Sequence, residues 1–305
     1  MKHLITTLGL VRQEDSGLIL PHEHVFVDLR NWREQGYATA RVEDVVGLMK
    51  PELERARLGG VFAIVECSPI GVGRRADLLR AVSEASGFPL VVPTGVYREP
   101  WMPEWVVQSS PEALSDWMLG ELTGEIEASG VQAAWIKLSA GDEGMTENEA
   151  KVLRSAAQAG IRTQALIGSH TVKGSVVREQ LDRIERVGYS PERFLWIHAQ
   201  AEPEFELNLE MAERGAWIEY DSIGSPEQDA ICLDRVVWMV GRGFAGQVLI
   251  SQDRGWYDPA IPGGGIPKPY THLVDVFLPK LRLAGVAEET IHMMTVDNPF
   301  RAFAR

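Results

Sequence analysis

The stretch VVREQLDRIERVGYSPERFLWIH, residues 176–198, contains the repeating unit on which the fold prediction depends. Residues 176–187 place apolar side chains at the spacing of an amphipathic helix, and Gly188 is typical of a helix C-terminus. The apolar run 194–197 has the length of a buried strand and is followed directly by His198. We therefore predict a helix, a short connection and a strand in this stretch.

The same alternation recurs along the whole chain. Seven more short apolar runs adjoin segments of helical period or end-of-helix glycines such as Gly160; they are residues 18–27, 61–65, 90–92, 133–138, 163–167, 216–220 and 248–250. Eight strand–helix units in about 250 residues are typical of a (β/α)8 TIM barrel, and we expect residues 1–305 to form one such domain. A doubly wound sheet is the alternative, but Gly71-Val72-Gly73 lacks the third glycine of a GxGxxG phosphate loop.

Composition argues against several classes of protein. Of the 305 residues, 45% are hydrophobic and 24% are charged, which is ordinary for a packed globular protein. The formal charge of −13 disfavours binding to nucleic acid or to an anionic membrane surface. We see no apolar run near the ~18 residues of a membrane span and no signal peptide. The two cysteines, Cys67 and Cys232, are far apart, so a reducing cytoplasm fits better than a disulfide framework.

Polar side chains recur at the C-terminal ends of the predicted strands. His22 and His24 lie two residues apart, so both can point to the same face of one strand. Taken alone, such a pair favours buried histidines bonded to backbone carbonyls over a metal site. The remaining residues of this kind are Lys137, His170, His198 and Asp253.

The spacing of these residues indicates that they meet at one end of the barrel. Successive gaps from His24 to Asp253 are 113, 33, 28 and 55 residues, and one barrel unit averages roughly 31 residues. The gaps place the six residues on strands 1, 4, 5, 6 and 8. Four imidazoles and a carboxylate at one point predict a site for first-row metals, and six positions exceed one tetrahedral shell.

Lys137 needs its own explanation because it lies inside the apolar run Trp135-Ile136-Lys137-Leu138. A buried ammonium group is costly unless its charge is removed or paired. The residue is therefore predicted to be a neutral or chemically modified amine. The alternative is a lysine that extends its amine to solvent at the strand end.

Together these motifs resemble the phosphotriesterase-related branch of the amidohydrolase superfamily, whose lactonase and esterase members this sequence is similar to. The resemblance covers essentially the whole chain and includes the ending Asn298-Pro299-Phe300. It implies two divalent ions per chain, Zn or otherwise Mn, Co or Fe, and an N6-carboxylysine at Lys137 that bridges them. By resemblance His22, His24 and Asp253 hold one ion, and His170 and His198 hold the other. We also expect a homodimer.

The resemblance further implies a mechanism. A hydroxide that bridges the two ions attacks a carbonyl, and Asp253 accepts its proton as a catalytic residue. Tyr97 matches a tyrosine beside the metal centre and could stabilise the developing oxyanion. Its alternative role is to pack at a strand end.

Departures from the family pattern bear on the substrate. Ala201 stands where phosphotriesterases place a relay aspartate, and the segment Tyr220-Asp221-Ser222 lacks the relay histidine. Residues 225–228 lack the lysine of members that act on phosphorylated lactones, and Arg254 is out of register. We therefore expect a non-phosphorylated lactone or ester; the alternatives are a phosphotriester or amide hydrolase, or a non-catalytic binding barrel.

Two segments, residues 97–111 and 254–270, are longer than ordinary connections and follow predicted strands. Both are therefore expected at the catalytic mouth. Tyr97, Trp101, Arg254, Trp256 and Tyr257 are the candidate substrate contacts, although the aromatic residues could simply pack the loops. The prolines and Gly263–Gly265 of the second segment predict a mobile lid.

Overall fold

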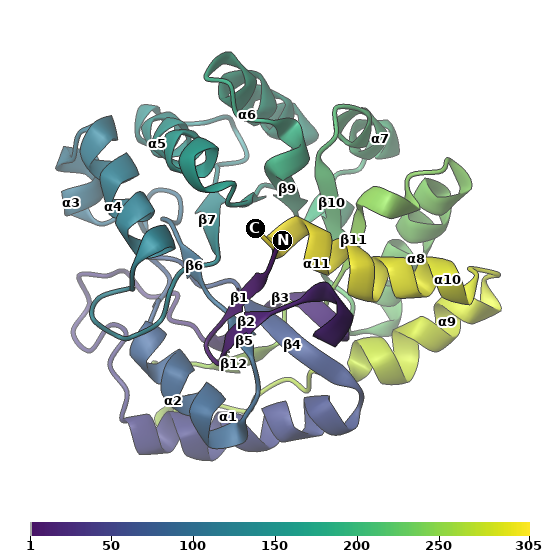
Figure 1. Cartoon of the computed structure of the whole chain (residues 1–305), viewed down its shortest axis with the longest axis horizontal. Coiled ribbons are helices and arrows are strands. Elements are labelled where there is room, and N and C mark those ends of the chain that lie inside the picture. The colour runs from purple at the N-terminus through teal and green to yellow at the C-terminus, as the bar shows by residue number, and fades with distance from the viewer. Residues whose placement is uncertain (1) are drawn as a thin grey trace.

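The computed structural model describes residues 2–305 and forms the predicted (β/α)8 barrel (Figure 1). One parallel sheet has the order β11 (Val248–Ile250), β10 (Trp217–Tyr220), β9 (Phe194–Ile197), β8 (Ile167–His170), β7 (Trp135–Ser139) and β6 (Pro93–Thr94). A second has the order β12 (Gly255–Tyr257), β3 (Leu18–Phe26), β4 (Val61–Glu66) and β5 (Leu90–Val91).

The two sheets join at both of their edges. At one edge, β5 and β6 are separated only by Val92 and form one interrupted strand. At the other edge, the backbone N–H of Asp253, three residues beyond β11, donates to the carbonyl of His22 in β3 at 3.1 Å. The strands therefore surround one central core, as the predicted barrel requires.

Helices cover the outside of the barrel in Figure 1. They are α1 (Val42–Leu58), α2 (Ala76–Ser86), α3 (Glu104–Gln108), α4 (Pro111–Thr123), α5 (Glu147–Thr163), α6 (Gly174–Arg186), α7 (Phe205–Glu213), α8 (Pro226–Gly241), α9 (Leu278–Leu283) and α10 (Glu288–His292). None of the helices within residues 2–305 is long and apolar enough to cross a membrane.

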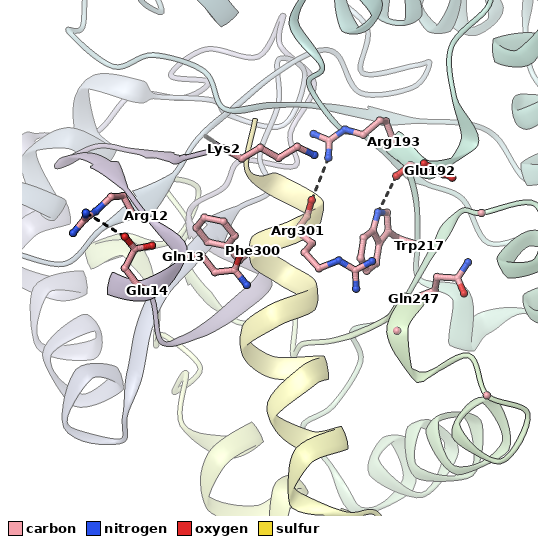
Figure 2. Close-up of a pocket in the computed structure, with 13 residues that line it drawn as sticks. Lys2, Arg12, Gln13, Glu14, Glu192, Arg193, Trp217, Gln247, Phe300 and Arg301 are labelled. Carbon is pink, nitrogen blue, oxygen red and sulfur yellow. Dashed lines mark hydrogen bonds and ion pairs between the residues drawn. The ribbon is translucent and has the colours of Figure 1, made fainter.

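The N-terminal end of the barrel is covered by the hairpin of β1 (Leu4–Thr6) and β2 (Gly9–Val11) and by α11 (Asn298–Phe303). Figure 2 shows Phe300 and Arg301 of α11 at this end, with Lys2 alongside. Inside the barrel, the ring of Phe303 packs edge-on against Trp135 at 5.1 Å between centroids. Because side chains alternate along a strand, Lys137 points to the same interior as Trp135 but lies nearer the C-terminal end of β7.

The sequence located most elements within two residues, but the predicted strand 163–167 is wrong. Helix α5 continues to Thr163, and β8 begins at Ile167. Gly160 does not end the helix; a Cβ at this position would lie 2.5 Å from the ring of Tyr189. This glycine therefore permits close packing, and the helix ends instead at Gln164, whose backbone is left-handed with φ of 60°.

Candidate metal centre

The six residues predicted as metal ligands all line one cavity of about 160 Å³. His22 and His24 belong to β3 and Lys137 to β7, whereas His170 is the last residue of β8. His198 and Asp253 follow β9 and β11. They meet because the C-terminal ends of the strands of a barrel surround a single opening.

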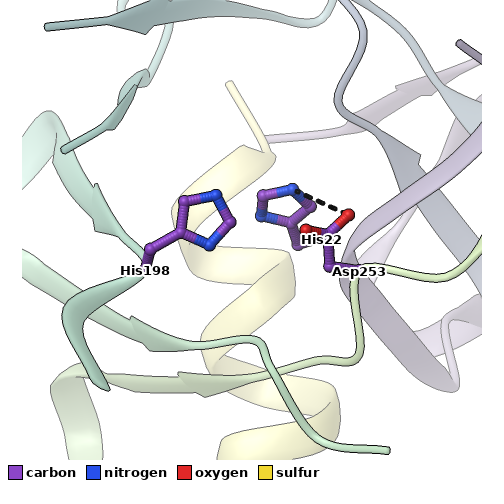
Figure 3. Close-up of side chains that lie close together, drawn as sticks. All are labelled: His22, His198 and Asp253. Carbon is purple, nitrogen blue, oxygen red and sulfur yellow. Dashed lines mark ion pairs between the residues drawn. The ribbon is translucent and has the colours of Figure 1, made fainter. Parts of the chain in front are cut away.

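Their geometry suits divalent cations. The Asp253 Oδ1 atom lies 3.2 Å from Nε2 of His24 and 3.9 Å from Nε2 of His22. Ligand atoms of His22, His198 and Asp253 all lie within 4.8 Å of one another (Figure 3). The Asp253 Oδ1 atom is buried and has no hydrogen-bond partner within residues 2–305. A buried anionic oxygen that faces imidazole nitrogens is a fitting ligand for Zn or a similar ion.

The two ligand groups that the resemblance assigns to separate ions are not separated in space. The rings of His22 and His198 are 5.0 Å apart between centroids, and those of His198 and His170 are 4.3 Å apart. Ions held by the two groups would therefore be close neighbours. This arrangement fits a shared bridging ligand.

Two buried acids behind the ligands, Glu219 in β10 and Asp221 after it, were not identified as functional from the sequence. Nδ1 of His22 lies 3.1 Å from Oε2 of Glu219 and 3.1 Å from Oδ2 of Asp221. Nδ1 of His198 lies 2.7 Å from Oδ1 of Asp221. A histidine that donates its Nδ1 proton to a carboxylate presents the lone pair of Nε2 to a metal. One aspartate thus orients two of the predicted ligands.

Burial and neighbouring charges set the protonation of His22, Asp221 and Glu219. Burial, assisted by Lys137, lowers the pKa of His22 to about 4, so the ring is a neutral ligand at pH 7. Burial alone would raise the pKa of Asp221, but His198 and His22 hold it well below its usual range. Burial and the adjacent Asp221 raise the pKa of Glu219 well above its usual range. Asp221 is therefore the ionised member of the acid pair.

Glu66, at the end of β4, and Ser68, just after it, contact His24. Its Nδ1 lies 2.8 Å from Oγ of Ser68 and 3.5 Å from Oε1 of Glu66. Although burial favours the neutral ring, the adjacent carboxylates of Asp253 and Glu66 raise the pKa of His24 to about 9. A divalent ion bound to His24 and Asp253 would compete with this proton.

Glu23, between the two histidines of β3, fixes the backbone around Asp253. Its Oε1 accepts from Oγ of Ser251 at 2.8 Å, and its Oε2 accepts from the N–H of Arg254 at 2.7 Å. Burial raises the pKa of Glu23 to about 8. The acid therefore joins the first strand of the barrel to the last at the level of the ligands.

Lys137 is 2% exposed, and no carboxylate of residues 2–305 lies within ion-pair distance of its amine. The side chain lines the cavity and does not reach the outer surface. The alternative of an amine extended to solvent is therefore wrong. An unpaired buried ammonium is expensive, and conversion to an anionic carbamate would remove that cost among metal cations.

Tyr97 and Trp256 are the two predicted substrate contacts that line the cavity. The hydroxyl of Tyr97 lies 3.3 Å from the ring nitrogens of His170. Trp101 packs edge-on against Tyr97 at 5.7 Å, and its Nε1 donates to the carbonyl of Leu29. Trp101 therefore supports Tyr97 and does not line the cavity.

The predicted contacts on the last loop have different orientations. Trp256 packs edge-on against His24, with 5.5 Å between ring centroids. Its neighbour Tyr257 stacks on Phe26 at 5.7 Å and lies outside the cavity lining. The guanidinium group of Arg254 donates to the carbonyl of Gly224 and also lies outside it.

The loop of residues 254–270 is anchored at its base by strand pairing, more firmly than a mobile lid would be. Gly255 pairs with His24 and Tyr257 with Phe26, in parallel register. Gly255 also exchanges two backbone hydrogen bonds with Lys268, at 3.1 and 2.9 Å. A Cβ on Gly255 would lie 2.0 Å from the carbonyl of His24, so only glycine allows this approach. Lid motion would be confined to residues 258–267.

Replacement of Trp256 by Ala is expected to change KM and the ranking of substrates, because the ring forms a wall of the cavity. Metal content should remain that of the wild type, since Trp256 is not one of the proposed metal ligands. Tyr257→Phe is the matched control because it keeps the stacking on Phe26. A lower melting temperature with an unchanged ranking would show that Trp256 only packs the loop.

Comparison with known proteins agrees with this geometry. The model of the phosphotriesterase family matches residues 2–303. The chain belongs to the phosphotriesterase family. Members of this family are binuclear metal hydrolases, so this chain is a metal-dependent hydrolase.

Three similar phosphotriesterase-family proteins illustrate the range of the family. A phosphotriesterase homology protein of Mycobacterium tuberculosis is 30% identical over 328 residues, covering 100% of this chain and 98% of its own. An aryldialkylphosphatase of Saccharolobus solfataricus is 25% identical, with coverage of 96% and 97%. A solved variant of a phosphotriesterase-like lactonase from Deinococcus radiodurans superimposes with a TM-score of 0.85 at 27% identity, covering 98% and 99%.

Proposed function

We propose that this hydrolase uses two divalent ions to cleave a small, non-phosphorylated lactone or ester. The observation that supports this most directly is the composition of the cavity. The six proposed metal ligands line it together with Val27, Leu29, Val72 and aromatic residues. Such a site combines Lewis acids with an apolar wall, which suits a neutral carbonyl compound.

The proposal assigns His22, His24 and Asp253 to one ion and His170 and His198 to the other, with Lys137 as a carbamate between them. Zn is the preferred metal by ligand type, with Mn, Co or Fe as alternatives. When bound, the two ions supply a polarised substrate carbonyl and a water that is acidic near neutral pH.

The chain's own residues have distinct tasks in this proposal. Asp253 can accept a proton because it is ionised: the neighbouring His24 and His22 outweigh burial and hold its pKa below the usual range. Asp253 can then pass the proton to the leaving oxygen. The hydroxyl of Tyr97 can donate to the oxygen on which negative charge develops. Burial raises the pKa of Tyr97, so it remains a donor.

The arginines near the cavity mouth support an uncharged substrate. Arg98 donates to the carbonyl of Ala140 at 3.1 Å and pairs with Asp142 at 3.4 Å. Arg254 is bonded to Gly224, as described above. Lys137 is the one lysine or arginine that lines the cavity in residues 2–305, and the proposal makes it anionic. A phosphorylated substrate would therefore lack a cationic partner here.

Substrate preference can be measured directly. We expect kcat/KM for small lactones or activated esters to exceed that for phosphotriesters, because Ala201 stands where phosphotriesterases place a relay aspartate and residues 220–224 contain no relay histidine. The ratio kcat/KM is the right comparison, since it reports the difference in transition-state binding. A phosphotriester that exceeds every lactone, ester and amide tested would reverse the assignment.

Metal content is an independent measurement. Elemental analysis of active protein is expected to give about two divalent ions per chain, because six ligands exceed the four of one tetrahedral shell. A single tightly bound ion in fully active protein would contradict the binuclear proposal.

A cytoplasmic homodimer remains part of the proposal. Cys67 and Cys232 are both free and buried, which fits a reducing compartment. Undetectable turnover by fully metallated protein across lactone, ester, amide and phosphotriester panels would instead support a non-catalytic binding role.

A further inference from the structure

A second cavity, of about 750 Å³, lies at the N-terminal end of the barrel (Figure 2). Its lining includes Arg193 just before β9, Trp217 at the start of β10 and Gln247 just before β11. Lys2, near the N-terminus, and Arg301, in α11, also line the cavity. This cavity shares no lining residue with the metal centre, which is at the opposite end of the strands.

Four cations line this cavity, namely Lys2, Arg12, Arg193 and Arg301, against the two acids Glu14 and Glu192. This local excess of positive charge contrasts with the formal charge of −13 of the chain. Within residues 2–305, neither Lys2 nor Arg193 nor Arg301 has an aspartate or glutamate oxygen within 4.0 Å. Arg12 also lines the cavity, but it is neutralised by Glu14 at 3.1 Å and by Asp15.

The three cations differ in how firmly they are held. Arg193 donates to the backbone carbonyls of Arg301 at 3.2 Å and Gln164 at 2.5 Å, and its Nε is buried without a partner in the described chain. Arg301 packs over the ring of Trp217 at 5.3 Å and otherwise donates only a long bond of 3.4 Å to Asn298. Lys2 donates no hydrogen bond to residues 2–305.

The local field around these residues is positive. Partial burial, then Arg193 and Arg301, lower the pKa of Lys2, and Glu192 opposes them only weakly. Arg193 itself has a lowered pKa because of burial. Each cation would therefore gain from an anion placed among them, and Lys2 and Arg301 have donors free to bind it.

We propose that this cavity binds a phosphate-bearing small molecule. Lys2 and Arg301 would hold the phosphate oxygens by charge-assisted hydrogen bonds. Arg193, fixed by its bonds to the backbone, would supply additional positive charge. The site lies too far along the barrel to share a ligand with the metal centre, so its occupant is not the substrate of the proposed reaction.

Calorimetric titration of inorganic pyrophosphate into the metal-loaded protein tests this proposal. We expect saturable binding at the cavity, weakened at least ten-fold in the double variant Lys2→Gln/Arg301→Gln. The matched control is Lys50→Gln/Arg154→Gln, which removes the same charge from α1 and α5 and should bind like the wild type. Melting temperatures of both variants establish that they are folded.

The variant Lys2→Gln/Arg301→Gln distinguishes this site from the metal centre, where a phosphate group could also bind. Binding at the metals alone would give the same titration for the wild type and for Lys2→Gln/Arg301→Gln, and an unchanged titration would overturn the proposal. Absence of saturable binding by the wild type, or tighter binding of citrate than of pyrophosphate, would also overturn it. None of these outcomes depends on which substrate the metal centre hydrolyses.

Discussion

Lys137→Ala is expected to lose its metals and its activity together. Without the side chain, the two ions would lose the anion proposed to hold them side by side. Loss of a partner outside the ligand shell typically weakens metal binding ~10–100-fold, so loss of the bridge should exceed about 100-fold. Elemental analysis after chelator competition, with kcat/KM on the same preparation, measures both effects.

Chemical rescue makes this prediction specific. Short carboxylic acids added with metal should restore part of the activity by occupying the space of the carbamate. Lys50→Ala on α1, where the half-exposed amine lies 3.7 Å from Oε1 of Glu54, is the control for loss of a lysine. If Lys137→Ala kept two ions and the full rate, the carbamate would have no place in the mechanism.

Asp221→Asn is expected to weaken metal binding by about 10–100-fold, as removal of partners that orient a ligand typically does. The carboxylate contacts Nδ1 of both His22 and His198, and its Oδ2 also accepts from the backbone N–H of His198 at 3.0 Å. An amide keeps the shape but cannot accept from both rings with full charge. Chelator competition followed by activity assay measures the change.

A matched variant separates this effect from general loss of stability. Glu121 is also a buried carboxylate, and it accepts from Arg74 at 2.6 Å and from Thr94 at 2.6 Å. It does not line the metal cavity. Glu121→Gln should lower the melting temperature but leave metal affinity unchanged. Equal metal loss in the two variants would refute the orienting role of Asp221.

The barrel and the location of the six candidate ligands could be predicted because both depend on periodic patterns. Strand ends recur at regular intervals, and parallel strands bring those ends to one face. Boundary errors arose where a local signal had a tertiary cause. Gly160 resembles the end of a helix in sequence, but it accommodates the ring of Tyr189 from a later segment.

The residues that support the ligands were harder to find. Glu219 interrupts the apolar run of β10 as Lys137 interrupts β7, and this signal could have identified it. Asp221 gives no such sign, because its role depends on contacts with strands about 20 and 200 residues away. Trp256 and Tyr257 show the same limit: their opposite directions follow from the pairing of β12 with β3.

The backbone of Trp256 has a consequence for how this protein could change. Its φ of 78° is left-handed, a conformation that costs an ordinary L-residue roughly 1–2 kcal/mol. Glycine would relieve that cost, because it has no Cβ, while removing the ring from the cavity wall. A Trp256→Gly substitution that enlarges the pocket would therefore regain, through the relaxed backbone, part of the stability lost with the ring. A first substitution toward bulkier substrates would therefore cost less stability here than at an ordinary position. It would also leave every proposed metal ligand in place.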